Sequence, residues 1–216
     1  MTNPVPELPG MGPHPQPWPD DPRLDSQLLA EGDRRNVVDR YRYWSVDAIV
    51  ADLDQHRHPF HVATENWVKD LNLGSIVRTA NAFGAEAVHI VGEKRWNRRG
   101  AMVTDRYQHV LHHPSMPEFA EWARARGLPI IGVDNIAGAV PIEVTMLPSE
   151  CVLLFGQEGP GLSPQAQEVC DQIVEISQFG STRSINASAA AAIVMHCWIR
   201  EHVFGRGSSL PSSLTR

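Results

Sequence analysis

The chain has 216 residues, of which 42% are hydrophobic and 20% are charged, a composition typical of a folded globular protein. No apolar run approaches the roughly 20 residues that a membrane-spanning helix needs. The N-terminus lacks the basic start and apolar centre of a secretory signal, so we expect a cytoplasmic protein. The net charge of -6 argues against a surface that binds nucleic acid everywhere, because such proteins usually carry a basic excess.

The cysteines and histidines show no pattern of a metal site or a disulfide framework. The three cysteines include no C-x-x-C pair and cannot all pair with one another. Two histidine pairs, His56/His58 and His112/His113, have no carboxylate or cysteine at ligand spacing. We therefore interpret these histidines as surface residues and expect no metal.

The first 58 residues are predicted to lie outside the main domain. Residues 1–22 contain eight prolines, which exclude a helix or a central strand and predict an extended, disordered arm. Residues 23–58 are predicted to form a helical extension, with a surface helix near Ser26–Val38. Ser45 is placed to cap a second helix, whose apolar stripe is Val46, Ile49, Val50 and Leu53.

Residues 59–205 are predicted to form the main domain, and residues 206–216 a flexible tail. Strands alternate with helices here, which predicts an α/β fold with a mostly parallel sheet and helices on both faces. The expected strands are Phe60–Ala63, Ala87–Val91, Pro129–Val133, Cys151–Phe155 and Gln172–Ile176. The expected helices are Asn72–Phe83, Pro117–Arg126, Ser163–Cys170 and Asn186–Val203.

Three segments near the ends of these elements carry polar residues that packing alone would not select. In 72–80, Asn72 and Arg78 lie off the apolar stripe of a helix, although a capping asparagine and an exposed arginine would also explain them. In 153–163, a buried strand runs into a turn with three glycines and Glu158. The glycines either let the backbone of this turn approach a ligand closely or simply form a tight connection between a strand and a helix. In 179–190, a polar loop opens an alanine-rich helix, which could also be an ordinary capped helix.

Taken in order, these segments read Asn-x-Gly-x-x-x-Arg-Thr-Ala, Phe-Gly-x-Glu-x-x-Gly-Leu-Ser and Ser-Ile-Asn-Ala-Ser. The pattern resembles the three motifs of the SpoU/TrmH family, RNA ribose 2'-O-methyltransferases of the SPOUT class, over residues 59–204. The resemblance implies a parallel-sheet domain with a C-terminal trefoil knot, S-adenosylmethionine as cofactor, RNA as substrate and a homodimer. The knot rests on the resemblance alone, since folded chains rarely thread through themselves.

The resemblance also implies roles for individual residues. Arg78 matches the family's catalytic arginine, and Asn72, Glu158, Ser184 and Asn186 match the other catalytic-site positions. Cofactor contacts are implied for three loops, at Val133, Asp134, Gly156, Gln157, Ile176 and Ile185. The sequence departs from the usual motif at Ile185, Ala187 and Gln178, of which Gln178 could make the adenosine pocket more polar.

Arg78 is the residue whose chemistry is hardest to assign. The family's mechanism gives it the hydroxyl proton, with help from an RNA phosphate. Neutralising an arginine at pH 7 costs roughly 7 kcal/mol, and a phosphate would hold it charged. We therefore favour Arg78 as the cation that positions the ribose-phosphate and stabilises developing negative charge.

A local basic segment is the candidate RNA contact. The cations and the tryptophan that could stack on a base are Lys94, Arg95, Trp96, Arg98 and Arg99, with Arg106 nearby. A solvated charged loop is the alternative interpretation of this segment.

For the whole chain, the alternatives to a 2'-O-methyltransferase are an inactive RNA-binding or assembly factor on the same scaffold and an unrelated nucleotide-binding enzyme. The second is disfavoured because neither phosphate-loop fingerprint is present. Transfer RNA is favoured over ribosomal RNA, because the extension is short for a separate RNA-binding domain.

Overall fold

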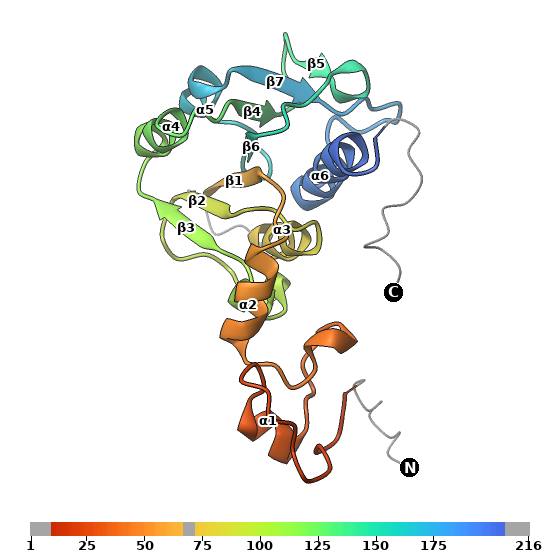
Figure 1. Cartoon of the computed structure of the whole chain (residues 1–216). Coiled ribbons are helices and arrows are strands. Elements are labelled where there is room, and N and C mark those ends of the chain that lie inside the picture. Colours follow the sequence, from red (N-terminus) through yellow and green to blue (C-terminus); the bar gives the residue numbers. More distant parts are fainter. Residues whose placement is uncertain (1–9, 67–71, 206–216) are drawn as a thin grey trace, which may run out of the picture. The chain divides into compact units, whose positions relative to one another are not determined.

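A computed structural model describes residues 10–66 and 72–205. The chain forms two compact units, residues 1–56 and 57–216 (Figure 1). None of the helices in the described ranges is long and apolar enough to cross a membrane. Residues 206–216, the predicted tail, lie outside the described residues.

The N-terminal unit contains two short helices, α1 (Ser26–Glu31) and α2 (Val46–Asp54), with a 3-10 turn at Asp39–Tyr41 between them. Helix α2 begins at Ser45, whose hydroxyl accepts from the amide of Ala48, as predicted. Helix α1 ends seven residues earlier than the predicted Val38. Gly32 follows it with φ of 92°, a conformation that stops a helix and favours glycine.

The predicted disordered arm is wrong for the part that the structure describes, residues 10–22. This segment has no helix or regular strand, as its prolines dictate, but it packs on the rest of its unit. The main chains of Met11 and Asp33 pair with each other at 2.9 and 2.8 Å. The hydroxyl of Tyr43 also donates to the carbonyl of Gly12 at 2.6 Å. These hydrogen bonds order residues 10–22, although composition alone predicts a disordered segment.

The second unit is built on one sheet of seven strands, all parallel, in the order β3-β2-β1-β6-β4-β7-β5. The strands are β1 (Phe60–Asn66), β2 (Val88–Gly92), β3 (Val110–His113), β4 (Ile130–Val133), β5 (Val140–Pro141), β6 (Cys151–Phe155) and β7 (Gln172–Glu175). The central strands β1, β2 and β6 are buried almost throughout, as expected of a parallel sheet covered on both faces.

Helices cover both faces of this sheet, as predicted (Figure 1). On one face, α3 (Asn72–Ala82) and α6 (Ala187–His202) form the larger core, in which the ring of Phe60 packs at a tilt against that of Trp198, with 4.5 Å between ring centroids. On the other face, α4 (Met116–Arg124) and α5 (Pro164–Val169) form a second core around Phe119. The expected fold class is therefore confirmed, and the knot stays a prediction of the family resemblance.

Two strands were not predicted, β3 and β5, and both lie at edges of the sheet. Strand β3 carries two histidines and an exposed leucine, Leu111, so it lacks the apolar run that marks a buried strand. Strand β5 has two residues, one of them a proline. Three 3-10 turns, Arg99–Ala101, Thr104–Arg106 and Ile142–Val144, lie within the connections.

A ladder of three histidines crosses strands β1, β2 and β3 on the face covered by α4. His61 Nδ1 lies 3.1 Å from His89 Nε2, and His89 Nδ1 lies 2.9 Å from His113 Nε2. The ring of Trp122 lies 4.1 Å from that of His89. The prediction that His112 and His113 are surface residues is therefore wrong for His113, which is buried.

Burial is the main reason that these imidazoles stay neutral in the folded chain. It lowers the pKa of His61 to about 4 and that of His89 to about 2, and it also lowers the pKa of His113. The neighbouring rings and the guanidinium of Arg126 act in the same direction on His89. A neutral imidazole can donate with one nitrogen and accept with the other, which is what a ladder of this kind needs.

The ladder predicts that stability falls as the pH is lowered from 7.5 to 5. Below about pH 6.5 the unfolded chain takes up a proton on each histidine that the folded ladder does not. For His89 this is a loss of about 1.4 kcal/mol of unfolding free energy per pH unit. Urea unfolding across this range measures it. His89→Gln should flatten the slope by one proton; a slope equal to that of the wild type would contradict the prediction.

Candidate functional site

A pocket of about 380 Å³ opens where the carboxyl ends of β4, β6 and β7 meet, the edge at which parallel sheets bind ligands. Its walls come from three separate loops of the chain. All six residues expected to contact the cofactor line it, together with three expected at the catalytic centre: Val133, Asp134, Gly156, Gln157, Ile176 and Ile185, with Glu158, Ser184 and Asn186.

A polar network joins the three motifs beside this pocket. Asn72, in the first turn of α3, donates through Nδ2 to Glu158 Oε2 in the glycine-rich turn. Asn186 Nδ2 donates to Asn72 Oδ1 at 2.9 Å and lies 3.4 Å from Glu158 Oε1. Residues 86 and 114 positions apart in the sequence thus share one set of hydrogen bonds. These hydrogen bonds link one side chain from each motif, with Asn72 buried and Glu158 and Asn186 exposed.

Asn186 has a second structural task, because it caps α6. Its Oδ1 accepts from the amides of Ser188 and Ala189, at 3.0 and 3.3 Å, and from the Ser188 hydroxyl at 2.6 Å. The alternative interpretation of this motif, a capped helix, is therefore correct, and the cap is Asn186. The Asn186 side chain therefore caps α6 through Oδ1 and donates to the network through Nδ2.

The glycine-rich turn is too tight for side chains at two of its positions. A Cβ on Gly156 would lie 2.1 Å from the carbonyl carbon of Gly161. Gly161 has φ of 72°, and a Cβ there would lie 2.3 Å from Asp134 Oδ2. Gln157 and Gly161 exchange two backbone hydrogen bonds of 3.0 Å across the turn. At Gly156 and Gly161 the turn therefore offers only backbone to a ligand, while the side chains of Gln157 and Glu158 also line the pocket.

Asp134 holds this turn in place. Its Oδ2 accepts from the amide of Leu162 at 2.7 Å, and its Oδ1 accepts from the amide of Asn135 at 2.8 Å. The family resemblance implied a cofactor contact for Asp134, and the structure gives its carboxylate a supporting role in the loop. Asn135, which was not predicted, lines the pocket and donates to the carbonyl of Arg183, tying the third motif to β4.

Buried polar residues at the end of β1 were also missed. Glu65 is fully buried, and its Oε2 accepts from the amide of Ser163, at the start of α5. Asn66 is fully buried too, and its Nδ2 donates to the carbonyls of Glu93 and Arg95 at 2.6 and 3.1 Å. Their signal in the sequence was the polar run Thr64, Glu65 and Asn66, which follows the predicted strand Phe60–Ala63 and belongs to β1 in the structure.

Arg78 does not line the pocket. It is exposed on α3, six residues after Asn72, and six residues turn an α-helix by about 240°. The two side chains therefore leave different sides of α3. Within one chain, the structure brings together Asn72, Glu158 and Asn186, and it leaves Arg78 outside their network.

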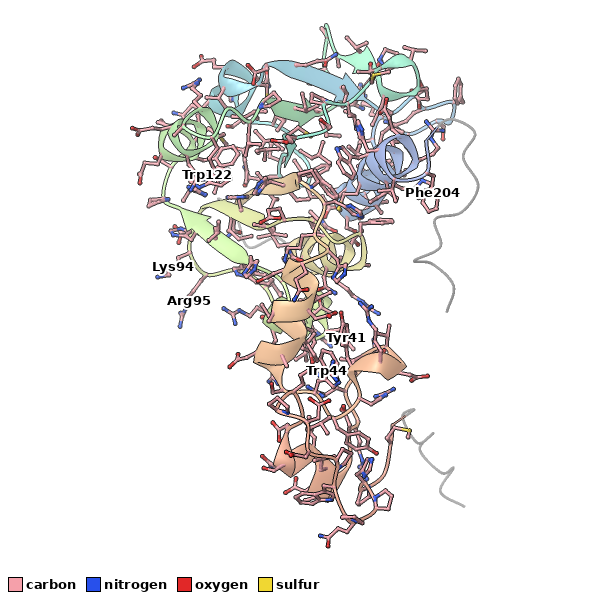
Figure 2. All side chains as sticks on the ribbon, in the orientation of Figure 1. Tyr41, Trp44, Lys94, Arg95, Trp122 and Phe204 are labelled. Carbon is pink, nitrogen blue, oxygen red and sulfur yellow. The ribbon has the colours of Figure 1, made fainter. Side chains whose placement is uncertain are left out.

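The basic segment follows β2 and lies against the first turn of α3. Gly74 and Gly100 touch there, since a Cβ on Gly74 would lie 2.8 Å from the Gly100 Cα. Lys94, Arg95, Arg98 and Arg99 are exposed, and Figure 2 shows Lys94 and Arg95 pointing outward. Trp96 is partly buried against the core of α3 and α6, with the Arg98 guanidinium 5.4 Å from its ring centroid.

The thiols near the sheet are not nucleophiles at neutral pH. All three cysteines are free. Burial raises the pKa of both Cys151 and Cys170 to about 12, and the reactive form of a cysteine is the thiolate. Within residues 10–66 and 72–205, no group of His, Cys, Asp and Glu side chains could hold a metal ion.

Comparison with known proteins places this domain. The family model described as the SpoU rRNA Methylase family matches residues 59–196. An uncharacterized tRNA/rRNA methyltransferase of Mycolicibacterium vanbaalenii is 32% identical over 195 residues, covering 81% of this chain and 58% of that protein. A putative TrmH family tRNA/rRNA methyltransferase of Bacillus subtilis, YacO, is 26% identical over 81% of this chain and 74% of its own length.

Solved structures agree with the sequence comparison. The SpoU methyltransferase AviRb of Streptomyces viridochromogenes, in complex with the cofactor AdoMet, has a TM-score of 0.63 and 27% identity. The similarity covers 72% of this chain and 62% of AviRb. An AdoMet-bound rRNA methyltransferase of Sinorhizobium meliloti has a TM-score of 0.59 and 28% identity, over 68% of this chain and 59% of that one. With its three motifs gathered at one edge of a parallel sheet, this chain belongs to the SpoU family of RNA methyltransferases.

Proposed function

We propose that this protein transfers a methyl group from S-adenosylmethionine to a ribose 2'-hydroxyl of RNA. The observation that carries the proposal is the hydrogen-bonded convergence of Asn72, Glu158 and Asn186 at the wall of the pocket. Two structural relatives support it, since AviRb was solved in complex with AdoMet and another relative is described as an RNA 2'-O ribose methyltransferase.

The pocket suits this cofactor in size and chemistry. Its volume of about 380 Å³ lies in the range of small-molecule sites. Val133, Ile176 and Ile185 give an apolar wall for a flat base, and the glycine-rich turn presents backbone groups. Gln178 also lines the pocket and adds a polar group to that wall. When bound, the cofactor supplies a methyl group on a sulfonium for in-line displacement.

The residues around the pocket have separate proposed roles in binding and in catalysis. Asn72 and Glu158 keep Asn186 in one orientation, so that Asn186 and Ser184 can meet the ribose or the amino acid part of the cofactor. Arg78 binds the ribose-phosphate and stabilises the developing alkoxide. Since Arg78 lies outside the pocket of its own chain, we propose a homodimer in which the arginine of one copy can serve the pocket of the other.

RNA is proposed to bind through the basic segment 94–99. The N-terminal unit, residues 1–56, carries ten Asp and Glu against five Lys and Arg, so it adds no positive field for phosphates. We propose transfer RNA rather than ribosomal RNA as the substrate, which also implies a cytoplasmic location. Labelled S-adenosylmethionine incubated with total RNA, followed by mapping of the methylated ribose, tests the whole proposal. Cofactor binding with no transfer to any RNA would instead support an inactive binding factor.

Substituting Asn186 should separate catalysis from helix capping. Asn186→Ala removes both the cap and the amide that reaches Asn72, so turnover falls and stability drops by about 1 kcal/mol. Asn186→Ser keeps a capping oxygen, so it should regain stability without regaining turnover. Thermal unfolding and methyl transfer measured on both variants check this. Turnover that recovers with the serine would show that capping is the residue's main task.

Arg78→Lys should lower turnover by about 100-fold, since it keeps the charge but loses the planar fork that binds a phosphate and an alkoxide together. Cofactor affinity should stay at the wild-type value, because Arg78 does not line the pocket. Isothermal titration with the cofactor and single-turnover methyl transfer measure the two effects. A lysine variant with near-normal rate would remove any need for the guanidinium.

Replacing Arg98 and Arg99 together by alanine should weaken RNA binding and flatten its dependence on salt. Each phosphate that the protein no longer neutralises lowers the slope of log K against log salt by about 0.7 to 0.9. Fluorescence anisotropy at several salt concentrations measures the slope. If it is unchanged, the segment is a solvated surface loop.

A further inference from the structure

The connection from β2 to β3 contains two exposed apolar residues that the sequence analysis did not single out. Met102 and Val103 are 60% and 51% exposed, and only Gly100 and Ala101 separate them from the basic segment 94–99. We call this pair the apolar tip. Isolated apolar residues on a surface are common, so the question is what distinguishes this pair.

The backbone of the apolar tip is its first distinguishing feature. Met102 has φ of 47° and Val103 has φ of 70°, both in the left-handed region. A β-branched residue such as valine is strongly disfavoured there, and such strain is kept where the surrounding structure enforces it and function uses it. The chain thus presents a bulky apolar pair where glycine would be the easy choice.

The surroundings hold the tip rigidly. On one side, Gly100 packs against the backbone of α3 at Gly74. On the other, the Thr104 hydroxyl donates to the carbonyl of Ala101 at 2.6 Å, and Arg98 pairs with Asp105 at 3.4 Å. These contacts place the tip beside α3, the helix that carries Asn72 and Arg78.

The charges around the tip favour RNA over protein. Exposed cations on both sides, Arg98 and Arg99 before it and Arg106 after it, would hold phosphates that flank an apolar contact. Trp96, the residue expected to stack on a base, is partly buried in the core and covered by Arg98. The exposed apolar side chains of the tip are therefore more accessible to a base than Trp96 is.

We propose that Met102 and Val103 pack against an unpaired nucleobase of the RNA, and that the neighbouring arginines hold its flanking phosphates. The inference rests on the proposed function for its choice of RNA as ligand. Apolar side chains that insert beside bases are known to unstack them, and a thioether packs well against aromatic rings. A base held at the tip would keep the ribose of an unpaired segment near α3, the helix that carries Asn72 and Arg78.

The experiment compares two RNA probes, a hairpin with 2-aminopurine in its unpaired loop and the blunt duplex of its stem. The wild-type chain should bind the hairpin more tightly and raise its 2-aminopurine emission. Met102→Ser/Val103→Ser should bind the hairpin about tenfold more weakly, leave duplex binding unchanged and abolish the emission change. The matched control is Val144→Ser/Met146→Ser, an exposed pair of the same residue types at 78% and 69% exposure, which should behave as wild type.

A single substitution separates the proposal from a folding defect. Val103→Gly relieves the left-handed backbone, so its melting temperature should equal or exceed that of the wild type while hairpin binding weakens. Loss on both probes, loss on neither, or no hairpin preference in the wild type would overturn the proposal. A changed oligomeric state of the double variant would also overturn it, by showing that the tip contacts a second copy. Methyl transfer by the wild type tests the proposed function separately, whatever the tip variants do.

Discussion

The hydrogen bonds among Asn72, Glu158 and Asn186 are the interaction on which the rest of the site depends. They form only when the first turn of α3, the turn after β6 and the start of α6 are all in place. Asn72 is buried, so leaving its amide unpaired would be costly, and its hydrogen bonds to the exposed side chains of Glu158 and Asn186 favour one arrangement of three distant segments. The pocket is the space that these segments leave at the end of the sheet, so their positions in the folded chain determine its shape.

Much of the sheet could be predicted because its central strands are apolar runs between clear turn signals. Strand β6 occupies the residues expected of it, Cys151–Phe155, and the four helices of the main domain lie within two residues of the predicted bounds. Strand β3 escaped prediction because its one buried position holds a histidine, His113, whose contribution depends on a partner in β2. The arm at 10–22 was misjudged because its contacts with Asp33 and Tyr43 come from sequence positions that composition does not relate.

The site was predictable where backbone geometry restricts the residue type. Gly156 and Gly161 could be singled out because the close contacts of the turn exclude side chains, and Asn186 because it begins a helix. Asp134 and Glu65 act by supporting another loop, and the backbone does not restrict the residue type at either position. Arg78 shows the converse limit, since the motif fixes its position on α3 but the structure leaves it outside the pocket.

The histidine ladder has a directional property that follows from its two hydrogen bonds. With all three rings neutral, His61 Nδ1 faces His89 Nε2, and His89 Nδ1 faces His113 Nε2. Both contacts are satisfied only if every ring carries its hydrogen on Nδ1, or every ring carries it on Nε2. The three tautomers are thereby locked together. A change of tautomer at the partly exposed ring of His61 would have to be matched two strands away at His113, so this edge of the sheet has two proton arrangements and no mixed one.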